Sequence, residues 1–189
     1  VHFERAGIPL EDIQLSCADT RDRIRAASLK DNNDARQFLY PTEITPDIET
    51  VTQFGQRFFT DNAPYGEALR AMLAAFKDEF EFDATATTVQ TPIAESLKTK
   101  RGVCQDSTHL MLAALRACGL SARYCSGYIL THPPEGQPRL TGADASHAWV
   151  SVYVPDIGWV QVDPTNNAVC DDQYVLVATG RDYSDVTML

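Results

Sequence analysis

Residues 101–109 read Arg101-Gly102-Val103-Cys104-Gln105-Asp106-Ser107-Thr108-His109, and this stretch decides the fold of the chain. It places a cysteine where a turn containing glycine passes into a helix, which we predict over residues 105–117. After its first turn this helix is apolar on nearly all sides, a pattern typical of a buried helix. We therefore expect it to be the central element of the core, with Gly119 in the left-handed position just beyond its end.

Cys104 stands at the first turn of the predicted helix. Free backbone N–H groups and the positive end of the helix dipole favour a thiolate at such a position. The same N–H groups are suited to stabilise an oxyanion that forms when the thiolate attacks an acyl group. Free cysteines more often only pack the core, however. On this stretch alone, Cys104 is either a nucleophile or a small packing residue at the start of the helix.

Length and composition describe an ordinary globular protein. The chain has 189 residues, of which 44% are hydrophobic and 22% are charged, which suits one domain with a sizeable core. A net charge of −10 argues against nucleic acid or an anionic membrane surface as a partner. The sequence has no apolar run of about 18 residues, the length that predicts a transmembrane helix.

The five cysteines are an odd number and include no CxxC pair, which indicates neither a dense disulfide framework nor a zinc ribbon. This usage favours a reducing compartment, so we expect a cytoplasmic location. No signal peptide is recognisable. Because the sequence starts at Val1 rather than Met, the chain can be a piece of a longer protein.

The chain has a helical first part and a strand-rich second part. We interpret residues 1–41 as an N-terminal arm or a connection to an upstream domain, and residues 42–189 as the main domain. Capping residues and apolar periodicity predict helices at residues 45–59, 65–80, 93–98 and 105–117. Alternation and β-branched residues predict strands at residues 121–130, 147–154, 159–163 and 173–179. Helices followed by antiparallel strands indicate the α+β class.

A nucleophilic cysteine needs a base, and the chain has four histidines. His109 is on the same helix as Cys104, but five residues at 100° each turn it about 140° away from the thiol, so we expect it to pack in the core. His2 lies in the N-terminal segment, and His132 lies in a polar loop beside prolines. His147 remains as the candidate base.

His147 opens one predicted strand, and Asp163 ends the next. If these strands form a hairpin in which Tyr153 pairs with Trp159, the two side chains lie on one face as diagonal neighbours, about 7–8 Å apart along the backbone. Asp163 can then orient the imidazole and stabilise its charged form. A register shifted by one residue would place them on opposite faces. Taken singly, each residue is more simply a strand-edge or turn residue; together with Cys104, they favour a triad.

Four segments carry a resemblance to a known family: Gly102 to Asp106, Ala122 to Tyr128, Ala145 to Val150 and Gly158 to Asn166. In this order they resemble the bacterial transglutaminase-like family, over roughly residues 46–183. The resemblance implies a papain-like core, in which a central helix bearing the cysteine packs on an antiparallel β-sheet bearing histidine and aspartate. It implies Cys104 as the nucleophile, His147 as the base and Asp163 as the orienting residue.

The resemblance also implies a class of reaction, namely thiol-dependent acyl transfer from an amide or peptide carbonyl through a thioester. Because the family includes protein crosslinkers, cysteine proteases, amidases and peptide deglycosylases, hydrolysis of a peptide or amide bond is the alternative. A non-enzymatic binding scaffold is a further alternative. We expect a protein, peptide or amide substrate, no cofactor and no metal, since the calcium sites of animal transglutaminases are not recognisable here.

Three residues are candidates for substrate binding: Trp149, Asp144 and Trp159. Tryptophans are more often core residues, but both lie on the strand face that carries His147 and Asp163. Asp144 precedes His147 by three residues, in the long polar loop. The sequence leaves the acyl acceptor open between water and an amine.

Overall fold

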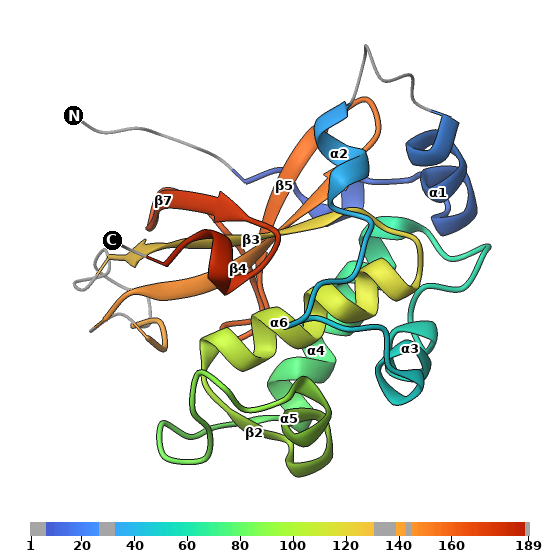
Figure 1. Cartoon of the computed structure of the whole chain (residues 1–189). Coiled ribbons are helices and arrows are strands. Elements are labelled where there is room, and N and C mark those ends of the chain that lie inside the picture. Colours follow the sequence, from blue (N-terminus) through green and yellow to red (C-terminus); the bar gives the residue numbers. More distant parts are fainter. Residues whose placement is uncertain (1–6, 27–32, 131–138, 143–144, 188–189) are drawn as a thin grey trace.

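The computed structural model of the chain describes residues 7–26, 33–130, 139–142 and 145–187. The helices in these ranges are α1 (Cys17–Ala26), α2 (Asn33–Gln37), α3 (Glu49–Gln56), α4 (Tyr65–Glu79), α5 (Ile93–Thr99) and α6 (Cys104–Ala117) (Figure 1). Two short 3-10 turns, η1 (Leu10–Asp12) and η2 (Tyr183–Asp185), lie near the two ends. No helix in the described ranges is long and apolar enough to cross a membrane. The helices α3 to α6 lie where the sequence predicts helices.

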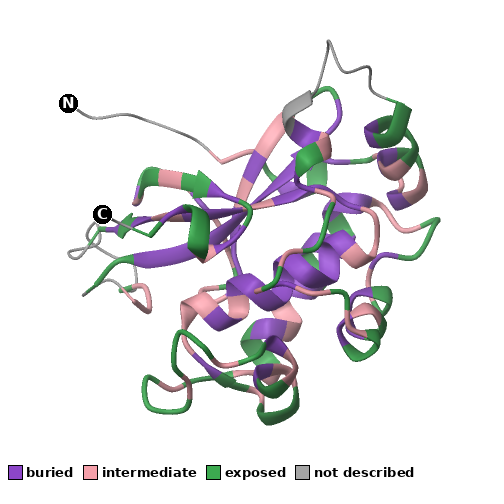
Figure 2. Ribbon diagram, in the orientation of Figure 1, coloured by how far each residue is buried: buried purple, intermediate pink, exposed green. Residues whose placement is uncertain are grey.

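The main sheet is antiparallel and has five strands in the order β6-β5-β4-β3-β7. Its strands are β3 (Ala122–Ile129), β4 (His147–Val154), β5 (Gly158–Asp163), β6 (Ala168–Val169) and β7 (Tyr174–Gly180). The middle strand β4 is buried along its whole length (Figure 2). A sheet packed against helices confirms the predicted α+β class.

Helix α6 is the central element of the core, as its apolar sequence predicts. The side chains from Leu110 to Leu115 are at most 4% exposed, and the helix packs on β3, β4 and α3. Gly55 lets α3 approach closely, because a Cβ there would come within 2.8 Å of the Ala114 carbonyl oxygen. The helix ends at Gly119, whose φ of 75° is the left-handed conformation expected for this position.

The register of the β4–β5 hairpin is the one that the sequence analysis requires. Tyr153 pairs with Trp159, and Val150 pairs with Val162. The valines of both strands belong to the main core, next to α6. Because side chains alternate along a strand, residues 147 and 163 fall on the opposite face and at the same end of the hairpin.

A second, two-stranded sheet was not predicted. Strand β1 (Glu81–Phe82) follows α4 directly and pairs in parallel with β2 (Arg101–Gly102). The sequence predicts an extended segment or loop at residues 81–89, because a strand of two residues is too short to give a periodic signal. This pair ties the end of α4 to the segment that leads into Cys104.

The described part of the N-terminal segment packs against the rest of the chain. Leu10, Ile13 and Cys17 are fully buried in the main core cluster. Farther along, Ile24 and Ala35 join Tyr153 in a smaller cluster on the other face of the sheet. Residues 7–41 are therefore no detached arm where the structure describes them, and the domain boundary at residue 42 stays a prediction.

Candidate active site

Cys104 is the first residue of α6, and its thiol is half-buried. The first N–H groups of a helix have no partner within the helix, so they point toward the space around this thiol. The chain enters the helix through a tight turn, with Lys100 in a left-handed conformation and Val103 extended. The nucleophile candidate therefore lies at the positive end of the buried core helix, as predicted.

The carboxylate of Asp106 holds the start of α6 in place. It accepts hydrogen bonds from the backbone N–H of Val103 at 2.8 Å and from the hydroxyl of Thr87 at 2.6 Å. Ser96 donates a longer one of 3.3 Å. Gly102 is needed beside it, because a Cβ at that position would come within 2.6 Å of an Asp106 carboxylate oxygen.

Replacement of Gly102 by alanine is expected to lower kcat of the acyl transfer that the family resemblance implies by about 100-fold. The new Cβ would push the start of α6, and Cys104 with it, out of position. Ser96→Ala is the matched control, since it removes the weakest hydrogen bond to Asp106 without crowding it. We expect near-normal kcat in that variant. Equal kcat in Gly102→Ala and the parent protein would contradict this role of the turn.

His147 and Asp163 meet directly in the structure. His147 Nε2 lies 2.8 Å from Asp163 Oδ2, and both side chains are fully buried. The other ring nitrogen, Nδ1, is buried without a well-formed hydrogen bond among the described residues. The Cys104 thiol is near enough to the ring to contribute to the raised pKa of His147. By elimination, Nδ1 is the nitrogen left for the thiol.

The Asp163 carboxylate is saturated with donors. Oδ1 accepts the backbone N–H groups of Thr165 at 2.8 Å and Asn166 at 3.3 Å. Oδ2 accepts the side-chain amide of Asn166 at 2.7 Å and the hydroxyl of Tyr174 at 2.9 Å, in addition to His147. Burial and the nearby Asp163 charge raise the pKa of Tyr174, so its hydroxyl stays protonated and donates. These contacts fix the carboxylate that orients the imidazole.

Asn166 also connects this carboxylate to the loop that precedes β4. Its side chain accepts the backbone N–H of Thr141 at 2.8 Å and donates to the Thr141 carbonyl at 3.1 Å. The next residue, Gly142, has a φ of 89°, and a Cβ on it would come within 2.6 Å of His147 Nδ1. The backbone of this loop therefore packs directly against the imidazole.

The electrostatics favour a charged imidazole. Burial opposes the charge, but the hydrogen bonds and the negative charges that Asp163 and Cys104 contribute together raise the pKa of His147 to about 9. A protonated His147 can give its proton to a leaving amine, as general acid catalysis requires.

The raised pKa of His147 gives a pH prediction. Activity that needs the imidazolium should fall as the pH rises through about 9, because the ring loses its proton there. Asp163→Asn removes the negative charge, so the alkaline limb of the kcat/KM profile should move to lower pH. An unchanged alkaline limb in this variant would show that Asp163 does not control the charge of His147.

The other described histidine lies away from the site chemistry, as predicted. His109 is 4% exposed, and its Nε2 accepts the backbone N–H of Tyr183 at 3.2 Å. Burial lowers the pKa of His109 to about 4, so this ring is neutral at physiological pH. His2 and His132 lie outside the described residues.

Trp149 and Trp159, the two tryptophans expected to bind substrate, belong to different clusters in the structure. Trp149 has no exposed surface; it stacks beside His147 at 6.2 Å and donates to Gln161. The expected role of both residues in substrate binding stays a prediction. Trp159 is at the far end of the hairpin, where it packs on Phe38. Asp144 lies outside the described residues.

The sequence alone assigned no role in the site to two residues that contact Asp163, namely Asn166 and Tyr174. Asn166 ends the quoted segment Gly158 to Asn166, and its place three residues after Asp163 was the available signal. Tyr174 comes from β7, and no spacing rule links it to Asp163. Among the described residues, no group of three or more His, Cys, Asp or Glu side chains could hold a metal ion.

Comparison with known proteins gives a consistent result. The sequence model of the transglutaminase-like superfamily matches residues 52–164 of this chain. An uncharacterized protein of Mycobacterium bovis is 41% identical over 155 residues, which are 80% of this chain and 48% of that protein. The chain thus spans about half the length of the mycobacterial relatives it matches.

Two further proteins are similar to this chain, one over a shorter aligned segment and the other at lower sequence identity. A protein-glutamine gamma-glutamyltransferase of Pseudomonas aeruginosa is 32% identical over 104 residues, covering 51% of this chain and 16% of that protein. The crystal structure of a provisionally assigned cysteine protease from Cytophaga hutchinsonii superimposes with a TM-score of 0.68 at 25% identity. That match covers 89% of this chain and 54% of the other.

Proposed function

The chain belongs to the transglutaminase-like superfamily, and on this premise we propose that it is a cysteine-dependent enzyme that transfers the acyl group of an amide or peptide carbonyl. The observation that carries the proposal is the 2.8 Å contact between His147 and Asp163, with the Cys104 thiol next to the same imidazole. This is the arrangement of nucleophile, base and orienting carboxylate that acyl transfer uses.

In the first step, the Cys104 thiol gives its proton to His147 and the thiolate attacks the substrate carbonyl carbon. The carbonyl oxygen becomes an oxyanion, which the free N–H groups at the start of α6 are suited to stabilise. The carbon–nitrogen bond then breaks, and His147 gives its proton to the departing amine or ammonia. The acyl group stays on Cys104 as a thioester.

In the second step, the acceptor replaces the thiol. A primary amine or a water molecule gives a proton to His147 while it attacks the thioester carbonyl. The bond to sulfur breaks, and the Cys104 thiolate and protonated His147 form again. With an amine the product is a new amide, and with water it is a carboxylic acid.

Hydrolysis is the second candidate. The similarity to the Cytophaga hutchinsonii structure, which is assigned provisionally as a cysteine protease, favours water as the acceptor. The similarity to the Pseudomonas aeruginosa gamma-glutamyltransferase favours an amine. A non-enzymatic scaffold is the least supported, because the chain retains His147 in contact with Asp163 and Cys104 near the same imidazole. The cytoplasmic location stays a prediction.

A single assay separates these alternatives. The purified chain is incubated with a glutamine-containing protein and a fluorescent primary amine, and amine incorporation, ammonia release and peptide release are recorded together. We expect ammonia or amine release that depends on Cys104. Incorporation of the amine identifies a transferase, and release without incorporation identifies a hydrolase.

The assay also has an outcome that contradicts the proposal. If no product forms from any amide or peptide donor, although iodoacetamide still alkylates Cys104 rapidly, the chain does not carry out this chemistry on such donors. Cys118→Ala serves as the matched control, since Cys118 is a half-buried thiol at the other end of the same helix.

A further inference from the structure

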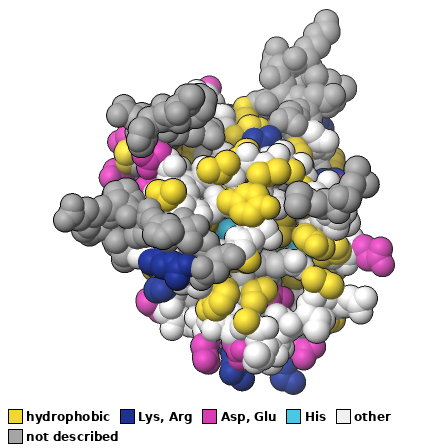
Figure 3. Space-filling view, turned by 90° about the vertical axis from the view of Figure 1, so that its left-hand side faces the viewer, with side chains coloured by type: hydrophobic (Ala, Val, Ile, Leu, Met, Phe, Trp, Pro, Cys, Tyr) yellow, Lys and Arg dark blue, Asp and Glu magenta, His cyan; other side chains and the backbone are white. Residues whose placement is uncertain are grey.

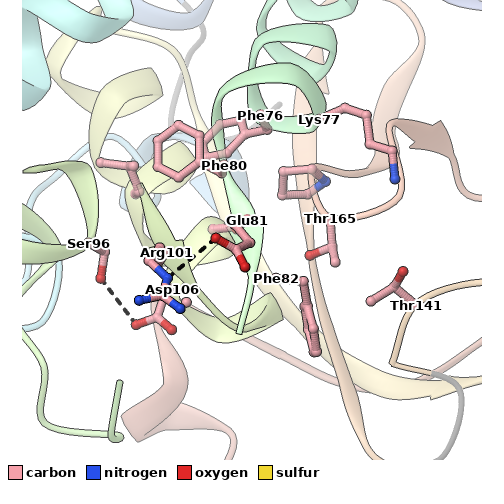
Figure 4. Close-up of a pocket in the computed structure, with 14 residues that line it drawn as sticks. Phe76, Lys77, Phe80, Glu81, Phe82, Ser96, Arg101, Asp106, Thr141 and Thr165 are labelled. Atoms are coloured by element: carbon pink, nitrogen blue, oxygen red, sulfur yellow. Dashed lines mark hydrogen bonds and ion pairs between the residues drawn. The ribbon is translucent and has the colours of Figure 1, made fainter. Parts of the chain in front are cut away.

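A pocket of about 70 Å³ lies between the end of α4, the β1–β2 pair and the start of α6. Its apolar lining comes from Phe76, Phe80, Phe82 and Leu110. Figure 4 shows the rings of Phe76 and Phe80 on one side of it, and Phe82 on the other side, beside Thr165 and Thr141. Nothing in the triad chemistry uses these apolar groups.

The pocket is lined by three segments that neighbour the proposed catalytic residues in the sequence, although none of the three catalytic residues lines it. Ser107 is one helical turn after Cys104, and Thr165 is two residues after Asp163. Thr141 precedes Gly142, which packs against the His147 ring. The pocket is therefore near enough to the start of α6 for an extended peptide bound at Cys104 to place a neighbouring side chain in it.

Phe82 has the most informative position of the lining residues. It pairs with Gly102, two residues before Cys104. Hydrogen bonds from Glu81 N to the Lys100 carbonyl and from Asp83 N to the Gly102 carbonyl, each 2.8 Å, fix it there. Its side chain is nevertheless 45% exposed. An aromatic ring held rigidly but left partly in water, beside a nucleophile, has apolar surface to offer a ligand.

Charged residues also line the pocket: Lys77, Glu81, Arg101 and Asp106. Arg101 pairs with Glu81 at 3.4 Å and with Asp83 at 2.5 Å. In Figure 4 the amino group of Lys77 points away from the rings of Phe76 and Phe80. On the face shown in Figure 3, hydrophobic side chains gather around visible histidine atoms, and charged side chains lie mostly toward the margin. Within this mixed lining, the partly exposed ring of Phe82 is the surface that suits an apolar ligand group.

We propose that this pocket binds an apolar side chain, such as that of leucine or phenylalanine, next to the reactive carbonyl of a peptide acyl donor. The donor is favoured over the acceptor because the pocket shares its wall with the start of α6, where the substrate carbonyl must sit. The proposal rests on the acyl-transfer function above and names the substrate class of that site.

Binding to the Cys104→Ala protein tests the proposal without any need for turnover. The probes are glutamine-containing pentapeptides that differ in one residue beside the glutamine, on either side in turn: leucine, phenylalanine or serine. We expect an apolar residue on one side to tighten Kd at least about tenfold over serine, the scale of an apolar pocket contact. Adding Phe82→Ala should remove this preference, and Phe82→Leu should retain most of it.

Two control variants make the result specific. Tyr40→Ala removes an exposed ring outside the pocket lining and should leave the preference unchanged. Val177→Ala changes a cavity on the β3–β7 side of His147. Equal binding of apolar and serine peptides would overturn the proposal, as would a preference that survives Phe82→Ala or disappears only in Val177→Ala.

The same peptides in the turnover assay separate this proposal from the proposed function. With Cys104 present, kcat/KM for apolar donors should fall at least about tenfold in Phe82→Ala, and that for serine donors should hardly change. Apolar binding that depends on Phe82, without any turnover, would support the pocket and contradict the enzymatic function. Turnover without any preference for apolar donors would support the enzymatic function and contradict the pocket proposal.

Discussion

Cys104→Ala is expected to lower turnover by at least about 10⁴-fold, the scale seen when the nucleophile of a triad is removed. The alanine cannot form the thioester, and the remaining groups act only by binding the substrate and stabilising the oxyanion. Cys104 packs at the edge of the main core and is only half-buried, so the loss of one sulfur atom there should change the free energy of unfolding little. Initial rates with a turned-over donor, together with a thermal unfolding curve, measure both effects.

The matched control for this prediction is Cys118→Ala. The Cys118 thiol is half-buried like that of Cys104, but Cys118 lies just beyond the C-terminal end of α6. Turnover in this variant should stay within a few-fold of the parent protein. Activity that survives in Cys104→Ala, or is lost equally in Cys118→Ala, would remove Cys104 from the role of nucleophile.

His147→Ala is expected to have two large effects. Turnover should fall by about 10⁴-fold or more, because no other group can take the proton of the thiol and return it to the leaving amine. The protein should also lose about 3–5 kcal/mol of its free energy of unfolding, because the fully buried Asp163 loses the partner of its charge. Urea unfolding and initial rates on the same preparation test the two effects separately.

The pH dependence of this stability loss has a definite sign. The pKa of His147 is raised to about 9 in the folded protein, from about 6.5 in an unfolded chain. Its contribution to stability is thus complete below pH 6.5 and is lost as the pH rises through 9. The stability difference between the parent protein and His147→Ala should shrink over this range. A difference that grows with pH would contradict the ion pair.

His109→Gln is the control for the histidine. It changes a ring that is also buried but neutral, with its pKa lowered to about 4, and that accepts a hydrogen bond from Tyr183. We expect a moderate loss of stability and a turnover close to that of the parent protein. A loss of turnover as large as that of His147→Ala would make His109 the base and refute the helical-phase argument.

Part of this site could be predicted because the relevant signals are local. The apolar run after Cys104 identifies a buried helix. The alternation of valines in residues 147–154 and 159–163 predicts which faces meet the core. The register that places His147 and Asp163 on one face was a condition of the sequence analysis, and the pairing of Tyr153 with Trp159 meets it.

The rest of the site depends on contacts between distant segments. Tyr174 contacts Asp163 because β7 is the edge strand of the sheet, next to β3. No local sequence pattern encodes this strand order. Phe82 reaches the start of α6 through a two-residue strand. Trp149 was expected to line a groove because the sequence places it on the same strand face as His147. Its burial comes from Cys125, Cys170 and Tyr174, which pack over that face of the sheet.

A thioester on Cys104 is the species that the proposed mechanism requires. The chain is mixed with a glutamine-containing peptide donor, quenched in acid within its first turnovers and analysed by mass spectrometry after proteolysis. We expect a thioester on the peptide that contains Cys104, with the mass of the donor less ammonia or less the departing amine, and its loss on treatment with hydroxylamine. An active protein that carries no such adduct, or carries it on another cysteine, would contradict a Cys104 thioester mechanism.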